Sequence, residues 1–145
     1  MTYRERLSPS PWIYVATALL IPASLLVFAP ISLPVGIVSA VVLFGGACTL
    51  LFATAPVLEV RDGEFRAGRA HIPLRFTGDA RGYRKEAATA ARGVDLDARA
   101  YLCLRGWVDP VLRVDVTDPD DPTPYWVVST RHPDELADAL RTARG

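Results

Sequence analysis

The sequence predicts an α+β membrane protein: an N-terminal two-helix transmembrane hairpin, then a small antiparallel β domain capped by a C-terminal helix. Three observations predict this fold class. Residues 7–58 contain no charged side chain. Short segments in which apolar and polar residues alternate begin at position 57. Residues 133–144 repeat apolar side chains at helical spacing, as an amphipathic helix does.

Two apolar stretches form the predicted hairpin, one from about Pro11 to Ala29 and one from about Val35 to Ala55. About twenty helical residues cross a hydrocarbon core of roughly 30 Å. The prolines of the intervening segment 30–34 disfavour a continuous helix, and so short a connection makes the two helices antiparallel neighbours. Pro22 is expected to kink the first helix.

Small residues on the second stretch allow another helix to approach its backbone closely. They are Gly36, Ala40, Gly45, Gly46 and Thr49. The sequence leaves open whether the partner is the first helix or another subunit. Neither stretch contains the acidic, basic or histidine side chains that transporters place inside the membrane, so we interpret the hairpin as an anchor.

Basic residues flank the hairpin on both sides. Arg4 and Arg6 precede it, several arginines follow it, and the loop between the two stretches is uncharged. The positive-inside rule therefore predicts a plasma-membrane protein whose termini and soluble domain are cytoplasmic. Two alternatives remain open: a cleaved signal peptide followed by a single anchor, and a hairpin buried in a soluble protein.

The predicted domain boundary follows the change in composition. Residues 1–56 are assigned to the N-terminal tail and hairpin, and residues 57–145 to the soluble domain. Within the latter, residues 59–105 carry a net charge of +3 and residues 106–145 a net charge of −4. The basic residues are dispersed and no aromatic residues are interleaved with them, so no nucleic-acid partner is predicted.

Strand and turn signals divide the soluble domain into short elements. Asp62-Gly63 predicts a hairpin turn, and Pro73 indicates an edge strand or a bulge. The alanine-rich segment 83–92 is interpreted as a short helix or an ordered loop. The predicted strands cover residues 57–61, 64–67, 70–76, 98–104, 111–116 and 125–130, and the predicted helix covers residues 133–144.

A few polar residues are suited to chemistry. Asp95 and Asp97 stand two positions apart, a spacing that directs both carboxylates to one face of a strand. One hypothesis is an enzyme that uses these two aspartates together with Arg99 and His71. It requires the four side chains to converge in one cleft. The alternative is that the carboxylates form structural ion pairs with Arg99 and Arg92.

Motifs for cofactors and metals are missing from the sequence, and no cofactor is predicted. The segment 118–124 alternates aspartate and proline but lacks the glycine and the distal glutamate of an EF-hand, so we expect a turn there. Ser129 lies close to His132 without a glycine-rich nucleophile elbow. Cys48 and Cys103 belong to different regions, and no disulfide is expected between them.

Two sets of residues are suited to binding. Arginines next to the predicted membrane segment match anionic lipid headgroups, with the bilayer itself as partner. They are Arg61, Arg66, Arg69 and Arg75, extended by Arg81, Arg84 and Lys85. Trp107, Tyr125 and Trp126 form a docking patch for a protein partner if they are exposed, and part of the core if they are buried.

The segments VLEVRDGEFRAGRAHIPL (57–74) and YWVVSTRHPDELADAL (125–140) resemble bacterial pleckstrin-homology-like domains. In such domains a Val-x-Asp-Gly hairpin leads to an Ile-Pro strand, and a Val-Ser strand leads to a Pro-x-x-Leu helix. These domains commonly follow a pair of membrane helices. The resemblance implies a small curved antiparallel sheet whose open face the last helix covers.

Nearly the whole chain also resembles a small actinobacterial two-pass membrane family (domain of unknown function 3093). The matching stretches are 3–7 with Pro9 and Trp12, 71–74, 97–101, 107–108, and 121–126 through Ser129 and Arg131. This resemblance implies the architecture and no established activity. We therefore expect a non-enzymatic, membrane-anchored adaptor that presents its domain to a protein partner, with anionic-lipid binding and an enzyme as the alternatives.

Overall fold

The computed structural model describes residues 3–145 and divides into two compact units. Ser8–Ala55 form a helical unit. Pro56–Gly145, together with the described residues up to Leu7, form a unit of two β-sheets and two helices. The chain therefore leaves the β unit after Leu7 and returns to it at Pro56.

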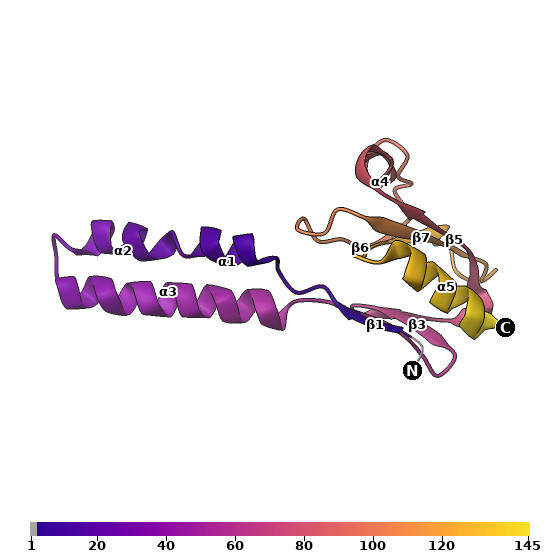
Figure 1. Cartoon of the computed structure of the whole chain (residues 1–145), viewed down its shortest axis with the longest axis horizontal. Helices are drawn as coiled ribbons and strands as arrows, with labels where there is room; N and C mark the ends of the chain where they lie inside the picture. The colour runs from indigo at the N-terminus through magenta and orange to yellow at the C-terminus, as the bar shows by residue number, and fades with distance from the viewer. Residues whose placement is uncertain (1–2) are drawn as a thin grey trace. The chain divides into compact units, whose positions relative to one another are not determined.

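The helical unit consists of α1 (Pro11–Thr17), α2 (Leu20–Phe28) and α3 (Leu33–Ala53), and α3 lies alongside α2 (Figure 1). The predicted helical hairpin is thus confirmed, with ends that differ by about two residues from the expected ones. Residues 11–28 and 33–53 are each long and apolar enough to cross a membrane. Most of their large side chains are exposed in the structure.

Pro22 interrupts the first helical segment, as predicted. Pro22 has no N–H with which to bond the carbonyl of Ala18, and its ring crowds that carbonyl. The backbone accordingly forms a turn at residues 18–19, between α1 and α2. The hydroxyl of Thr17 donates to the carbonyl oxygen of Ile13 at 2.7 Å and so satisfies one acceptor at the end of α1.

The small residues of α3 divide into two groups. Gly36 and Ala40 are buried. A Cβ atom on Gly36 would lie 3.4 Å from Cδ2 of Leu25 and 3.6 Å from Cβ of Phe28, so α2 of the same chain is the close partner at this position. Gly45 and Gly46 have no described atom within 4 Å of such a Cβ.

The first sheet has the order β1-β2-β3-β4 and is antiparallel throughout. Its strands are β1 (Tyr3–Arg6), β2 (Val57–Arg61), β3 (Glu64–Ala67) and β4 (Ala70–Pro73). Asp62 and Gly63, both with positive φ, make the predicted hairpin turn between β2 and β3. β4 is the edge strand that Pro73 indicated, and residues 74–76 continue as a 3-10 helix, η1 (Leu74–Phe76), instead of a strand.

The predicted boundary at residue 56 is wrong for the start of the chain. Residues 3–6 are not a tail of the hairpin, because they pair with β2 in register from Tyr3 opposite Val60 to Arg6 opposite Val57. Leu7 is fully buried in the core of the β unit. Alternation explains the pairing: Tyr3, Glu5 and Leu7 are directed inward, while Arg4 and Arg6 are exposed.

The second sheet has the order β5-β7-β8-β6. Its strands are β5 (Thr77–Tyr83), β6 (Tyr101–Cys103), β7 (Val111–Val116) and β8 (Tyr125–Ser129). The expectation of a wholly antiparallel domain is corrected here, because β6 runs parallel to β8. Parallel pairing requires a long crossover between the strands, and residues 104–124, which include β7, supply it.

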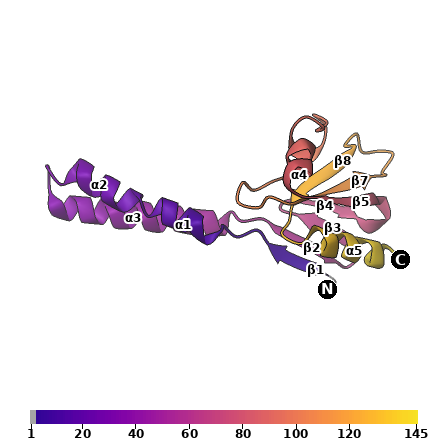
Figure 2. The same cartoon turned by 45° about the horizontal axis from the view of Figure 1, so that its top comes forward.

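One core lies between the two sheets, and α5 (Pro133–Arg144) covers its end (Figures 1 and 2). Apolar side chains of both sheets and of α5 meet in this core; examples are Val60, Phe65, Leu112, Trp126 and Leu136. A second, smaller cluster lies on the other face of the second sheet, under α4 (Lys85–Arg92). β8 is therefore buried on both faces over its whole length.

Candidate functional site

The three aromatic residues do not form an exposed docking patch. Trp126 is 5% exposed and packs in the main core, with its ring 4.8 Å from that of Tyr101 and 5.7 Å from that of Phe65. Tyr125 is 6% exposed and points to the opposite face of β8. Trp107 is half-buried, and its indole N–H donates to the carbonyl oxygen of Leu7 at 3.2 Å. The core alternative therefore holds for Tyr125 and Trp126, and Trp107 packs against the main core while remaining partly exposed.

The four arginines predicted to face lipid are all exposed, and their local partners differ. Arg61 pairs with Asp62 at 2.9 Å, and Arg66 pairs with Glu64 at 3.0 Å. The guanidinium of Arg75 lies 4.8 Å from the ring centroid of Phe76. Arg69 lies in the turn between β3 and β4.

The outward face of the first sheet collects charge in a cross-strand row. Arg4 stands opposite Glu59, Glu59 opposite Arg66, and Arg66 opposite His71. Neighbouring side chains on one face of a sheet interact directly. Glu59 thus stands between Arg4 of β1 and Arg66 of β3, and all three side chains lie on the same face of the sheet.

The residues of the enzyme hypothesis lie on different layers. His71 belongs to the outward face of the first sheet, whereas Asp95, Asp97 and Arg99 follow α4 beside the second sheet. Asp97 forms the predicted ion pair with Arg99, at 3.0 Å. The hydrogen bond from Arg99 lowers the pKa of Asp97 and raises that of the guanidinium. Arg92 pairs with Asp109 at 3.3 Å, not with Asp95.

The acidic loop between β7 and β8 is a turn, as expected. The Asp118 carboxylate accepts a hydrogen bond from the backbone N–H of Asp120 at 2.9 Å, and the Asp121 carboxylate accepts one from Thr123 at 2.9 Å. Local bonds of this kind stabilise turns. Across residues 3–145 no three His, Cys, Asp or Glu side chains come together in a group that could hold a metal ion.

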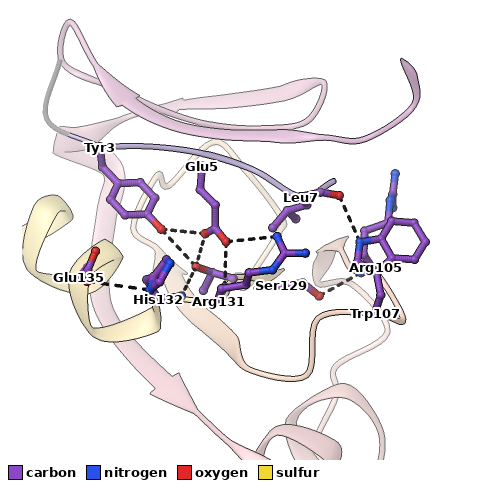
Figure 3. A network of polar contacts seen from close by, with 10 residues as sticks. Tyr3, Glu5, Leu7, Arg105, Trp107, Ser129, Arg131, His132 and Glu135 are labelled. Carbon is purple, nitrogen blue, oxygen red and sulfur yellow. Dashed lines mark hydrogen bonds and ion pairs between the residues drawn. The ribbon is translucent and has the colours of Figure 1, made fainter. Parts of the chain in front are cut away.

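A buried carboxylate, which sequence reasoning missed, joins β1 to the end of β8. Only 9% of the Glu5 side chain is exposed. Its Oε2 accepts a hydrogen bond from the hydroxyl of Tyr3 at 2.7 Å (Figure 3). The same oxygen accepts a second hydrogen bond from the hydroxyl of Thr130 at 2.5 Å. Its Oε1 accepts one from the backbone N–H of Arg131 at 2.9 Å, and the Arg131 guanidinium lies 4.0 Å away.

Thr130 extends this network toward α5. Its hydroxyl oxygen accepts a hydrogen bond from the backbone N–H of His132 at 3.1 Å. His132 is the residue before α5, and its carbonyl oxygen accepts from the N–H of Leu136 at 3.0 Å. The His132 ring lies 3.9 Å from the Glu135 carboxylate (Figure 3). Glu5 is therefore connected through one hydroxyl to the start of the C-terminal helix.

Burial governs the acidity of Tyr3. Its phenol is removed from water, which disfavours the phenolate and raises the pKa well above the ordinary value. Glu5 raises it further through its hydrogen bond and negative charge, and the hydrogen bond to Thr130 acts in the opposite direction. The phenol consequently remains a hydrogen-bond donor to the carboxylate at neutral pH.

The two points where the chain leaves and re-enters the β unit are tied to each other. The N–H of Leu7 donates to the carbonyl oxygen of Pro56 at 2.9 Å. The carbonyl of Leu7 in turn accepts from the Trp107 indole, and the N–H of Arg105 donates to the Ser129 hydroxyl at 3.0 Å (Figure 3). Ser129 is thus fully buried and structural in its contacts.

The hydrogen bonds of Glu5 and Leu7 attach the start of the described chain to the rest of the β unit. The signal for this attachment is present in the sequence, because Tyr3, Glu5 and Leu7 alternate with Arg4 and Arg6. The partner strand, however, begins fifty residues later, at Val57. A local reading of hydrophobicity separates the two segments and so misses the pairing.

One family model matches residues 2–140, and its description is "Protein of unknown function (DUF3093)". No curated protein and no solved structure matches the chain.

Proposed function

The chain belongs to this family of unknown function, and from that premise we propose that it is a membrane-anchored adaptor. In this proposal the helical hairpin spans the plasma membrane, and the β unit lies in the cytoplasm and binds a protein partner. The hairpin itself carries no chemistry.

The pairing of β1 with β2 is the observation that carries the proposal. β1 precedes the helical unit and β2 follows it, yet the two strands are hydrogen-bonded neighbours in one sheet. If the helices cross a bilayer, the chain must return to the side from which it started. A two-pass hairpin meets this condition, whereas a single crossing would place β1 and β2 on opposite sides.

The exposed surface of the helical unit supports insertion. Leu26 is 78% exposed, Val41 67% and Leu50 64%, although each lies in a stretch without any charge. Contiguous apolar surface of this extent is unfavourable in water and favourable in lipid. Both stretches are helical, which is the form in which a chain segment satisfies most of its own backbone groups in hydrocarbon.

The pairing of β1 with β2 in the first sheet also argues against the alternative of a cleaved signal peptide. Cleavage after the first apolar stretch would remove β1, and with it the buried side chains of Glu5 and Leu7. The Thr130 hydroxyl and the backbone N–H of Arg131 would then lose the Glu5 carboxylate as their acceptor. Retention of the N-terminus is therefore favoured, and the arginines on both sides of the hairpin favour a cytoplasmic location.

An edge strand is the surface that we assign to the partner. Tyr125 and Trp126 are buried and Trp107 is half-buried, so we turn to the edges of the two sheets as places for an added strand. β6 is such an edge, and its Leu102 is 43% exposed. The resemblance to pleckstrin-homology-like domains belongs to this proposal: two sheets and a last helix agree with it, while the parallel β6 departs from it.

Cysteine labelling on intact cells tests the topology. In a background with Cys48→Ala and Cys103→Ala, one variant carries Ile31→Cys in the interhelical loop and a matched variant carries Gly145→Cys. A membrane-impermeant maleimide should label position 31 from outside, and position 145 only after permeabilisation. Labelling of position 145 on intact cells would overturn the cytoplasmic assignment.

Site-specific photo-crosslinking tests the adaptor role. A crosslinking amino acid at Leu102 on β6 should give a discrete adduct with one protein in cells. The matched control is Val94, which is 90% exposed in the loop after α4 and should give none. Equal adducts at the two positions, or no adduct at Leu102, would contradict docking along β6.

A second candidate function, contact with anionic lipid, is favoured by the outward face of the first sheet. That face carries Arg4, Arg6, Arg61 and Arg66 against Glu59 and Glu64. Arg6 and Val57 lie within two residues of the helical unit in the chain. The full chain in neutral-lipid nanodiscs should then co-sediment with phosphatidylglycerol vesicles and not with phosphatidylcholine vesicles, and high salt should abolish this binding.

A further inference from the structure

A cavity of about 270 Å³ lies between α4 and the outer face of the second sheet. Its roof is the alanine face of α4, namely Ala87, Ala90 and Ala91. Its floor includes Tyr125 and Val127 of β8. Alanine side chains are too short to fill the space between a helix and a sheet, so the cavity is a consequence of the composition of α4.

Two opposite charges line the same cavity without pairing with each other. Arg113 of β7 is one, and Asp95 of the loop after α4 is the other. The Arg113 guanidinium lies 3.9 Å from the ring centroid of Tyr125, and its Nε donates to Asp115 at 3.1 Å. Among residues 3–145 no other hydrogen-bond partner of this guanidinium is present, so its two terminal amino groups remain available.

The position of Asp95 is set by the floor of the cavity. The Tyr125 hydroxyl donates to the carbonyl oxygen of Asp95 at 3.3 Å and accepts from the N–H of Asp97 at 2.6 Å. The N–H of Asp95 itself donates to the carbonyl oxygen of Ala90 at 3.0 Å. The loop that carries the carboxylate is therefore held between α4 and β8.

Hydrogen bonds to Asp109 hold both ends of α4, the helix that covers the cavity. Asp109 accepts a hydrogen bond from the N–H of Lys85, the first residue of α4, at 3.1 Å. The guanidinium of Arg92, the last residue of α4, donates to the Asp109 carbonyl at 2.6 Å and to its carboxylate at 3.3 Å. Preformed walls reduce the ordering cost of binding, so a ligand that fits this cavity would incur little of that cost.

We propose that this cavity binds a small zwitterion with an apolar side chain, such as an apolar amino acid. The ligand carboxylate pairs with the free amino groups of Arg113, and the ligand ammonium pairs with Asp95. The apolar side chain lies against the alanines of α4 and Val127. The volume limits the ligand to about this size, because pockets for drug-sized molecules begin at roughly 300 Å³. This site is independent of the edge strand assigned to a protein partner.

A ligand series on the unaltered full chain tests the charge requirement. L-Phenylalanine is the probe, and equilibrium dialysis of the protein in nanodiscs measures its binding. 3-Phenylpropionate lacks the ammonium group, and 2-phenylethylamine lacks the carboxylate. We expect saturable binding of L-phenylalanine and at least tenfold weaker binding of each analogue, because each leaves one charged group of the cavity unpaired. Equal binding of either analogue, or no saturable binding of L-phenylalanine, would overturn the zwitterion proposal.

Variants locate the site. Ala91→Leu fills the space while leaving both charges in place, and it should abolish binding of L-phenylalanine. Arg113→Gln should weaken binding at least tenfold. Arg81→Gln is the matched control, because Arg81 lies opposite Arg113 on β5 but lines only the adjacent polar groove. Circular dichroism verifies folding; unchanged binding in folded Ala91→Leu would place the ligand elsewhere and contradict the proposal.

Discussion

Thr130 donates its hydroxyl hydrogen to the Glu5 carboxylate at 2.5 Å, although 125 positions separate the two residues. The contact joins the first strand of the chain to the residue after the last strand. Because Glu5 is nearly buried, its charge depends on these donors in place of water. The β unit is thereby closed by residues that lie on either side of the helical hairpin in the sequence.

Glu5→Gln should destabilise the β unit by about 2 kcal/mol. The glutamine oxygen can still accept from Arg131, but its NH₂ group faces two hydroxyls that were donating to the carboxylate. Urea denaturation of the full chain in mild detergent, followed by tryptophan fluorescence, measures the loss. Glu64→Gln is the control: its exposed pair with Arg66 should contribute less than about 1 kcal/mol. Equal losses in the two variants would contradict the role of Glu5.

Elements that carry their own local pattern were predicted closely. Val57–Arg61, Glu64–Ala67 and Val111–Val116 alternate apolar and polar residues, and Pro133–Arg144 has an acidic first turn and a basic last turn. In each case the observed bounds equal the predicted ones. The two apolar helical segments could also be predicted from the sequence, because a long uncharged stretch is recognised without knowing its partner.

Elements that depend on a distant partner were not predicted. β1 is charged at Arg4, Glu5 and Arg6, so its pattern resembles a tail until β2 is placed beside it. β5 contains glycine, aspartate and arginine and little apolar alternation, yet it pairs with the strong strand β7. The cavity under α4 was likewise not predicted, because only the fold brings Arg113 and Asp95 to the lining of one cavity.

Alkaline pH should destabilise the β unit through its buried proton donors. Burial raises the pKa of Cys103 above its ordinary 9.0 and those of Tyr3 and Tyr101 above 10.0. Below the ordinary values both the folded and the unfolded chain keep these protons. Above them the unfolded chain loses its protons first, so stability falls as pH rises beyond about 9.

Melting temperatures of the full chain at increasing pH test this prediction. The wild type should show a steady value near neutral pH and a decline from about pH 9 upward. Tyr3→Phe removes one of the titrating groups and should make the decline shallower, although the variant is less stable at neutral pH because it lacks the hydrogen bond to Glu5. A parallel decline in the two proteins would show that Tyr3 is not a contributor.

Gly82→Ala should destabilise the β unit by about 1–3 kcal/mol. A Cβ at this position of β5 would lie 2.9 Å from Cβ of Pro133, the first residue of α5. The proline ring cannot rotate away, so the strand and the helix must separate. Gly106→Ala is the control, since no described atom lies within 4 Å of its added Cβ. Thermal unfolding monitored by circular dichroism should show a lower midpoint for Gly82→Ala alone.

Gly36→Leu should weaken the packing of α3 against α2, whereas Gly46→Leu should not. A side chain on Gly36 would meet Leu25 and Phe28 at ordinary contact distance already at its Cβ, so the remaining three carbons of leucine must displace α2. A Cβ added to Gly46 would have no described atom within 4 Å. Both variants gain the same helix propensity of about 0.8 kcal/mol, so the difference between them isolates the helix contact.

The matched pair is measured by disulfide trapping within the hairpin. Ser24→Cys on α2 and Ala40→Cys on α3, both in buried positions of the helical unit, provide the reporter in a Cys48→Ala, Cys103→Ala background. Oxidation should link the two cysteines less efficiently in Gly36→Leu than in Gly46→Leu, because closely packed helices favour the bond. Equal trapping would mean that Gly36 does not set the separation of α2 and α3. A larger loss in Gly46→Leu would instead place an intermolecular or unseen helix contact at the second glycine.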